Sequence, residues 1–153
     1  MTEFVKALEV QTHSEAETLK WAEDFAKTLP KGSVLALYGT LGAGKTVISR
    51  GICKGLGFQG QVNSPTYTIV HEYPNPNGMP LFHLDLYRLS PHADLGEIGV
   101  DYYMTRDGVT LIEWPERLDD ETVGITHRLT LSILEDDSRN IFVETSTSQP
   151  SNP

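Results

Sequence analysis

The stretch of sequence that decides the fold is Gly39-Thr40-Leu41-Gly42-Ala43-Gly44-Lys45-Thr46. It matches the phosphate-binding loop pattern G-x-x-x-x-G-K-[ST] at every required position. The three glycines let successive backbone N–H groups point inward at an anion, and the dipole of the following helix adds to this attraction. In such loops the lysine reaches the β- and γ-phosphates, and the hydroxyl residue after it ligates Mg²⁺. The stretch therefore predicts a site for a nucleoside triphosphate and Mg²⁺.

The residues on either side favour this interpretation over a glycine-rich structural turn. Before the loop, the mostly apolar run Ser33–Tyr38 predicts a short buried strand. After it, apolar and small residues recur at helical spacing and predict a helix, with Gly55 and Gly57 as candidate C-caps. These residues are Val47, Ile48, Gly51, Ile52 and Leu56. The lone cysteine, Cys53, lies in the same helix and is expected to be core packing. A strand, a loop and a helix in this order are the context that the loop requires.

Further strand and helix patterns surround this unit. The capping box Ser14-Glu15-Ala16-Glu17 predicts a helix that ends before Pro30. The turn-rich segment Pro74–Pro80 separates two strand patterns and predicts a hairpin, so the sheet is expected to be mixed. Other strands are expected at residues 6–12, 127–134 and 140–144, with a turn at 136–139. We predict an α/β fold, a P-loop NTPase-like sandwich with a central mixed β-sheet flanked by helices.

Length and composition limit the organisation of the chain. Its 153 residues, 39% of them hydrophobic, support one compact domain, which we place at residues 1–144. The polar residues 145–153 are expected to form a disordered tail. No apolar run approaches the roughly 20 residues that span a bilayer, so no membrane association is expected. With one cysteine no internal disulfide can form, and we expect a cytoplasmic protein.

The charge of the chain is negative and unevenly spread. Its net charge is −9, and all of its lysines lie at or before Lys54. A protein that grips tRNA or DNA by itself needs a basic face to replace the counterions of the phosphates. We therefore expect any contact with nucleic acid to be indirect, and we expect a protein partner instead.

Two carboxylates are candidates for work at the phosphate site. Asp85 follows Leu81-Phe82-His83-Leu84, where the polar His83 is atypical of a buried strand, and Glu113 ends the apolar run that starts at Gly108. Phosphoryl-transfer sites use an acidic residue at a strand end to hold Mg²⁺ or to orient water. The alternative for Asp85 is an exposed strand residue paired with Arg88. The alternative for Glu113 is a capped, partly buried acid.

Four motifs in register, GTLGAGKT, NSPTYTIVHEY, HLDLYRL and LIEWPER, resemble those of the small bacterial TsaE family over about residues 7–144. This resemblance implies a cytoplasmic ATPase that acts with the partners TsaB and TsaD in making threonylcarbamoyladenosine at position 37 of tRNA. It implies ATP and Mg²⁺ as cofactors, with nucleotide contacts from the loop and Val47. Lys45 binds phosphate in this reading, and Thr46 and Glu113 ligate Mg²⁺.

The same resemblance assigns further roles. Asp85 corresponds to the Walker-B-like aspartate needed for turnover, Thr66 to a switch-like position, and Trp114 to a residue beside the site. The segment near Thr12 and Ser14, together with Arg139, resembles the regions that flank the adenine. The alternative for Arg139 is an ordinary surface arginine.

Three other functions share parts of this pattern. A small-metabolite kinase shares the loop but brings an arginine-rich lid, whereas the five arginines after the loop helix are isolated here. A nucleotide-gated assembly module with incidental hydrolysis shares nearly all of these residues, so the sequence discriminates it poorly. A GTPase is disfavoured because no N-K-x-D motif is present. We favour hydrolysis of ATP by an in-line water, slow in the isolated chain because no arginine finger is evident.

Overall fold

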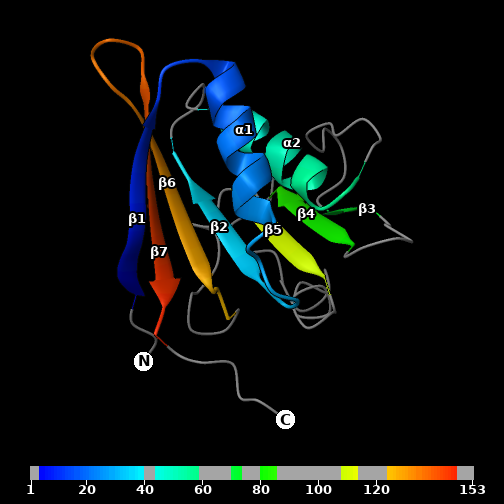
Figure 1. The fold of residues 1–153 in the computed structure, drawn as a ribbon. Helices are drawn as coiled ribbons and strands as arrows, with labels where there is room; N and C mark the ends of the chain where they lie inside the picture. Colours follow the sequence, from blue (N-terminus) through cyan, green and yellow to red (C-terminus); the bar gives the residue numbers. More distant parts are fainter. Residues whose placement is uncertain are drawn as a thin grey trace.

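Figure 1 shows the fold of the chain in a computed structural model. The structure describes residues 4–39, 44–58, 70–73, 80–85, 108–113 and 124–147, and for residues 70–73 and Asp85 it describes the backbone alone. Several predicted site residues lie outside these ranges, as does the predicted tail beyond residue 147. These site residues are Thr40, Leu41, Gly42, Ala43, Thr66 and Trp114.

The described strands form one seven-stranded sheet in the order β1-β7-β6-β2-β5-β4-β3. The strands β6, β2, β5 and β4 run parallel to one another, whereas β1, β7 and β3 pair antiparallel with their neighbours. Their bounds are β1 Phe4–Thr12, β2 Val34–Tyr38, β3 Val70–Tyr73, β4 Leu81–Asp85, β5 Val109–Glu113, β6 His127–Ile133 and β7 Arg139–Ser146. The mixed sheet and the β3–β4 hairpin are therefore confirmed.

The centre of the sheet is the most apolar part of the chain. In β2 the residues Val34–Leu37 are all buried, and so are all five residues of β5. A strand that is covered on both faces has a continuous run of apolar residues, whereas a strand with one exposed face alternates apolar and polar residues. The sequences of β2 and β5 both show the continuous pattern. This burial is what fixes β2 and β5 next to each other, and the loop predicted to bind phosphate follows β2 directly.

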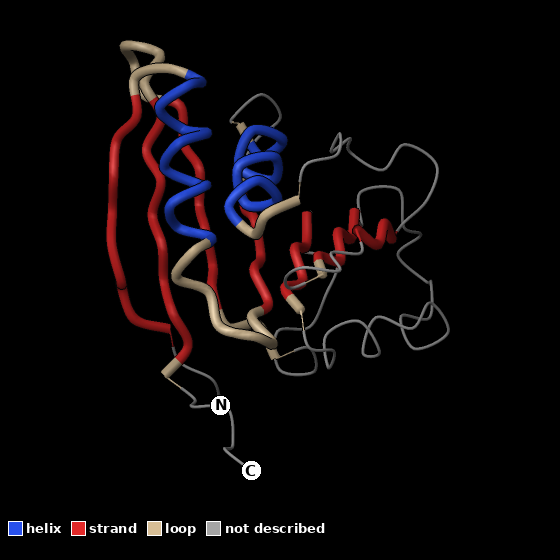
Figure 2. Tube along the Cα trace, turned by 45° about the vertical axis from the view of Figure 1, so that its right-hand side comes forward, coloured by secondary structure: helices blue, strands red, loops and turns tan. Residues whose placement is uncertain are grey.

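Two helices lie together against one face of the sheet (Figures 1 and 2). Helix α1, Glu15–Ala26, begins as the capping box predicts: the Ser14 Oγ accepts from the N–H of Glu17 at 3.1 Å. The Glu17 carboxylate accepts from the N–H of His13, one residue earlier than a standard capping box. Helix α2, Lys45–Gly55, ends at the C-cap Leu56, and Gly57 follows it with a left-handed φ of 94°. Gly57, rather than Gly55, therefore closes this helix.

Gly55 has a different role, because it lies where α2 touches α1. A methyl group on Gly55 would overlap the carbonyl oxygen of Glu23 and lie 2.7 Å from the Cβ of Ala26. One turn earlier, a methyl group on Gly51 would lie 2.5 Å from the Cβ of Ala22. Two glycines at i and i+4 thus let the two helix backbones approach closely, with small residues facing them. The contact holds both helices in one layer over the sheet.

The last strand is longer than the sequence predicts. We placed the start of a disordered tail at Thr145, but β7 continues through Thr145 and Ser146. Thr145 pairs with Val5 of β1 on one side and with His127 of β6 on the other. A strand between two neighbours satisfies its backbone groups on both sides, and this outweighs the polar side chains that made the segment resemble a tail. Strand β7 also starts at Arg139, a residue that the sequence analysis placed in the turn before the strand.

The lone cysteine behaves as predicted. Cys53 is buried in the core between α2 and the sheet, and burial raises the pKa of its thiol to about 12. Such a thiol is protonated at neutral pH and is unreactive as a nucleophile. Neither described helix has the length and apolar character that a membrane crossing needs.

The α1–α2 contact leads to a test of stability. Replacing Gly55 by alanine should lower the free energy of unfolding by about 1–3 kcal/mol, because the added methyl group overpacks the helix interface. Helix propensity alone would give the opposite sign, since alanine is favoured over glycine by about 1 kcal/mol. Urea denaturation measures the difference. Lys54→Ala, next to it in the exposed part of α2, serves as the control and should change stability little. A Gly55→Ala protein as stable as the parent would show that the interface tolerates the methyl group.

Candidate functional site

The phosphate-loop motif leads into α2 at a position whose backbone conformation favours glycine. Gly44 is the N-cap of α2 and has a φ of 109°, in the left-handed region that disfavours a side chain. Gly39, at the other end of the motif, also has a positive φ, 151°. Among the described residues no side chain caps α2, whereas Ser14 caps α1. Within the described ranges, the first turn of α2 therefore has no side-chain cap on its N-terminus, which is compatible with an anion site.

The first residue of α2 is a buried lysine. Lys45 is only 8% exposed, and the Ser49 hydroxyl donates to its carbonyl oxygen at 3.0 Å within the helix. Lysine is rarely buried unless its charge has a partner. Its position after Gly44 places a positive charge at the start of the helix, where the dipole already favours a negative group. Thr46 and Val47 follow on the first turn and are partly exposed.

Both candidate carboxylates lie at the carboxyl edge of the parallel strands. In the β2–β5 ladder Leu37 pairs with Glu113, and in the β4–β5 ladder Asp85 pairs with Glu113. Because β2, β4 and β5 are parallel, their carboxyl ends meet at the edge where the motif leaves β2. In open α/β sheets this edge is where ligands bind. The structure thus places Glu113 next to the end of β2 and the backbone of Asp85 next to Glu113, and the roles of both acids in phosphoryl transfer stay predictions.

Glu113 is not an exposed acid. It is 5% exposed, and its Oε2 lies 2.9 Å from the Nε2 of His83. His83 is 1% exposed and stands two residues before Asp85 on β4. The sequence identified His83 only as an atypical polar residue in an apolar strand. The signal in the sequence that could have identified His83 as a site residue was its spacing from Asp85, because residues two apart in a strand lie on the same face.

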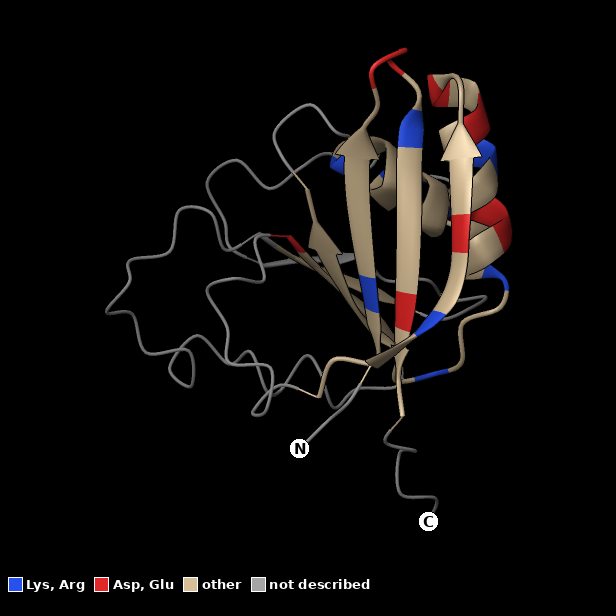
Figure 3. Ribbon diagram, turned by 90° about the vertical axis from the view of Figure 1, so that its left-hand side faces the viewer, with Lys and Arg blue, Asp and Glu red and all other residues tan. Residues whose placement is uncertain are grey.

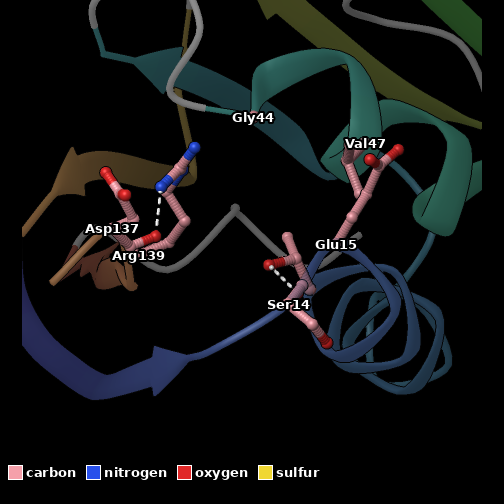
Figure 4. Close-up of a pocket in the computed structure, with 7 residues that line it drawn as sticks. Ser14, Glu15, Gly44, Val47, Asp137 and Arg139 are labelled. Atoms are coloured by element: carbon pink, nitrogen blue, oxygen red, sulfur yellow. Dashed lines mark hydrogen bonds between the residues drawn. The ribbon is translucent and has the colours of Figure 1, made fainter.

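A pocket of about 190 Å³ opens beside Gly44. It is far larger than the roughly 30 Å³ that one water molecule occupies. Three segments distant in the sequence line it: the start of α1, the start of α2 and the turn between β6 and β7 (Figure 4). The lining residues are Ser14, Glu15, Thr18, Gly44, Val47, Asp137 and Arg139. The predicted positions Ser14 and Arg139 therefore lie beside the motif, although the sequence did not identify Glu15, Thr18 or Asp137.

The β6–β7 turn holds Arg139 in this pocket. The Arg139 Nη1 donates to the carbonyl oxygen of Asp137 at 2.5 Å, and in Figure 4 the guanidinium points to the side on which Gly44 lies. Asp136 accepts from both the hydroxyl and the N–H of Ser138, and these bonds hold the pKa of its carboxyl below the usual value. The turn is therefore ordered by its own side chains, and Arg139 leaves it in a defined direction.

Thr12 lies behind the pocket and does not line it. It is 3% exposed, and its hydroxyl is 2.6 Å from the hydroxyl of Thr18, which is a lining residue. It also pairs with Arg139 across the β1–β7 ladder. Thr12 thus touches two residues of the pocket wall, and its predicted role at the adenine stays a prediction.

The donor set at the edge fits Mg²⁺ rather than a metal held by protein ligands alone. Within the described ranges, no group of three or more His, Cys, Asp or Glu residues could hold a metal ion. Mg²⁺ keeps several waters and binds through one or two carboxylates plus the phosphates of its substrate. A carboxylate with one oxygen bonded to histidine still has acceptor sites for a cation. Glu113 is therefore chemically suitable as one such carboxylate, and its pairing with the hydroxyl of Thr46 in a single Mg²⁺ site stays a prediction.

Comparison with known proteins agrees with this geometry. The family model described as "Threonylcarbamoyl adenosine biosynthesis protein TsaE" matches residues 12–141. The chain belongs to the TsaE family. It is 36% identical over 132 residues to the tRNA threonylcarbamoyladenosine biosynthesis protein TsaE of Treponema pallidum, covering 86% of this chain and 96% of that protein. The TsaE protein of Synechocystis is 45% identical over 104 residues, which is 66% of each chain.

A solved structure confirms the fold. The crystal structure of YdiB from Bacillus subtilis superposes with a TM-score of 0.73 at 31% sequence identity, covering 95% of this chain and 87% of that one. The curated TsaE of the same organism is 36% identical over 137 residues, covering 90% of this chain and 85% of that protein. The α/β fold predicted from the order of strand and helix patterns is thus shown.

Charge on the described β1–β7–β6 side is mixed. Figure 3 shows positions of Lys and Arg interspersed with positions of Asp and Glu along these strands and α1. The expectation that any contact with tRNA is indirect stays a prediction.

Proposed function

We propose that this TsaE-family protein is a Mg²⁺-dependent ATPase that acts with TsaB and TsaD to form threonylcarbamoyladenosine at position 37 of tRNA. Membership in the family and the names of its relatives support the pathway. One observation carries the nucleotide role: a buried lysine follows a left-handed glycine at the start of α2, at the sheet edge where Glu113 is buried. Contact with tRNA is indirect, and we place the activity in the cytoplasm with its partners.

In this proposal the loop and α2 bind the phosphates. The motif Gly39–Thr46 would bind the β-phosphate through its backbone N–H groups, and the start of α2 would add its dipole. The Lys45 ammonium neutralises charge on the β- and γ-phosphates. Because Lys45 is buried, this interaction takes place in a medium of lower effective dielectric than water, where it is stronger.

The carboxylates Glu113 and Asp85, at the carboxyl edge of the parallel strands, are proposed to act on the metal and the attacking water. Glu113 and Thr46 would hold Mg²⁺, which when bound supplies charge neutralisation across the β- and γ-phosphates. Asp85, next to Glu113 in the ladder, is proposed to orient the metal's water shell or the nucleophilic water. Thr66 occupies a switch-like position, and Trp114 lies beside the site in the sequence pattern.

The pocket beside Gly44 is proposed to take the adenine. It adjoins the loop, so a base there would be continuous with phosphates at the start of α2. Arg139 can stack its planar guanidinium on a base, Val47 offers an apolar contact, and Thr12 supports the wall through Thr18. Specificity for the base thus comes from three chain segments and affinity for the phosphates from the loop.

Removing the charge of Lys45 tests the nucleotide role. Lys45→Ala should weaken ATP binding by about 10- to 150-fold, because a hydrogen bond to a charged group contributes about 1.5–3 kcal/mol. Isothermal titration calorimetry with Mg²⁺ and ATP measures this affinity. Lys54→Ala, an exposed lysine of the same helix, is the matched control and should bind as the parent does. Parental affinity in Lys45→Ala would refute the phosphate assignment.

A second variant separates the base from the phosphates. Arg139→Ala should weaken ATP about 10-fold, the equivalent of about 1.4 kcal/mol, through loss of stacking. The same variant should bind inorganic tripolyphosphate as the parent does, because the loop is untouched. If both ligands bind the variant with parental affinity, Arg139 is an ordinary surface arginine.

A further inference from the structure

We propose that His83 is a positioning residue that holds the carboxylate of Glu113 in the orientation that binds Mg²⁺. This inference rests on the proposed function, since it requires Glu113 to be a metal ligand. Neither the family resemblance nor the sequence motifs gave His83 a role.

The two side chains meet because of the strand register. In the parallel β4–β5 ladder His83 pairs with Leu111, and Glu113 is the next residue of β5 on the same face. The His83 Nε2 is 2.9 Å from the Glu113 Oε2, and both side chains are more than nine-tenths buried. Since both residues belong to central or near-central strands, neither end of this hydrogen bond can move far without disturbing the sheet. The bond therefore fixes one carboxylate oxygen and, with it, the plane of the group.

The hydrogen bond also has a defined direction. A carboxylate that ligates a metal can only accept, so the histidine must carry its proton on Nε2. The other ring nitrogen, Nδ1, is buried and has no hydrogen-bond partner among the described residues. A proton on Nδ1 would be a buried N–H without a described acceptor, which is costly. Both arguments place the donor at Nε2, toward Glu113.

Burying a polar histidine side chain in an apolar strand costs free energy unless the side chain forms a hydrogen bond there. Its neighbours Leu81, Phe82 and Leu84 are all buried, so an apolar side chain would satisfy the strand at lower cost. A role as the donor that orients a metal-binding carboxylate accounts for a histidine at this position. Loss of such a partner typically weakens metal affinity 10–100-fold. A merely structural histidine would change stability and leave the dependence on Mg²⁺ unaltered.

The test uses three substitutions of His83 in the full chain. His83→Leu removes the donor, His83→Gln keeps an amide N–H near the position of Nε2, and His83→Asn keeps an amide that is too short to reach Oε2. The readout is the concentration of MgCl₂ that gives half of the thermal stabilisation by a non-hydrolysable ATP analogue. We expect this concentration to rise at least about 10-fold in His83→Leu and His83→Asn, and to stay within about 3-fold of the parent in His83→Gln. Leu84→Val, on the opposite face of β4, controls for a loss of stability alone.

A double-mutant cycle completes the test. In a Glu113→Gln protein, His83→Asn should cause no further change in the dependence on MgCl₂, because the group that it positions is gone. The inference is overturned if the three His83 variants and the parent require the same concentration of MgCl₂, or if His83→Asn and His83→Gln behave alike. A parent protein that binds the analogue without any dependence on MgCl₂ would instead overturn the proposed function of Glu113. If His83→Leu does not fold, the difference in MgCl₂ dependence between His83→Asn and His83→Gln decides whether His83 positions Glu113.

Discussion

The parallel pairing of β2 with β5 is the constraint on which the rest of the structure depends. It aligns Leu37 with Glu113, so the buried carboxylate lies at the level where the chain leaves β2 for the phosphate-loop motif. A shift of one residue would turn Glu113 and its neighbours to the opposite face of the sheet. Burial of nearly every residue in both strands makes such a shift expensive. The geometry of the candidate site is thus a consequence of core packing.

The second constraint is the close contact between α1 and α2. Gly51 and Gly55 let the helices approach until a methyl group on either would overlap the other helix. The starts of both helices then lie around one pocket, which the β6–β7 turn completes with Arg139. In the proposed function the loop would bind the phosphates and this pocket the base, so helix packing would determine how the two parts of the site adjoin.

Local patterns predicted much of this arrangement. The strand before the motif, the helix after it, the N-cap at Ser14 and the hairpin were all confirmed, because each depends on residues close in sequence. The extension of β7 through Ser146 was not predicted, because its pairing with β1 and β6 overrides a polar composition. The bond between His83 and Glu113 spans 30 residues and arises from strand register, which no local pattern encodes. The roles of Lys45, Thr46, Asp85 and Glu113 stay predictions, now with their positions known.

The most direct test of the central claim is the rate of ATP hydrolysis by the purified chain with Mg²⁺, alone and after addition of TsaB, TsaD and tRNA. The account predicts a low basal rate, because the arginines after the loop helix are isolated in the sequence and offer no evident arginine finger, and a clear rise when the partners are present. A rate that is the same with and without the partners would contradict the account. It would leave a nucleotide-binding protein of the TsaE family whose hydrolysis is not coupled to the proposed machinery.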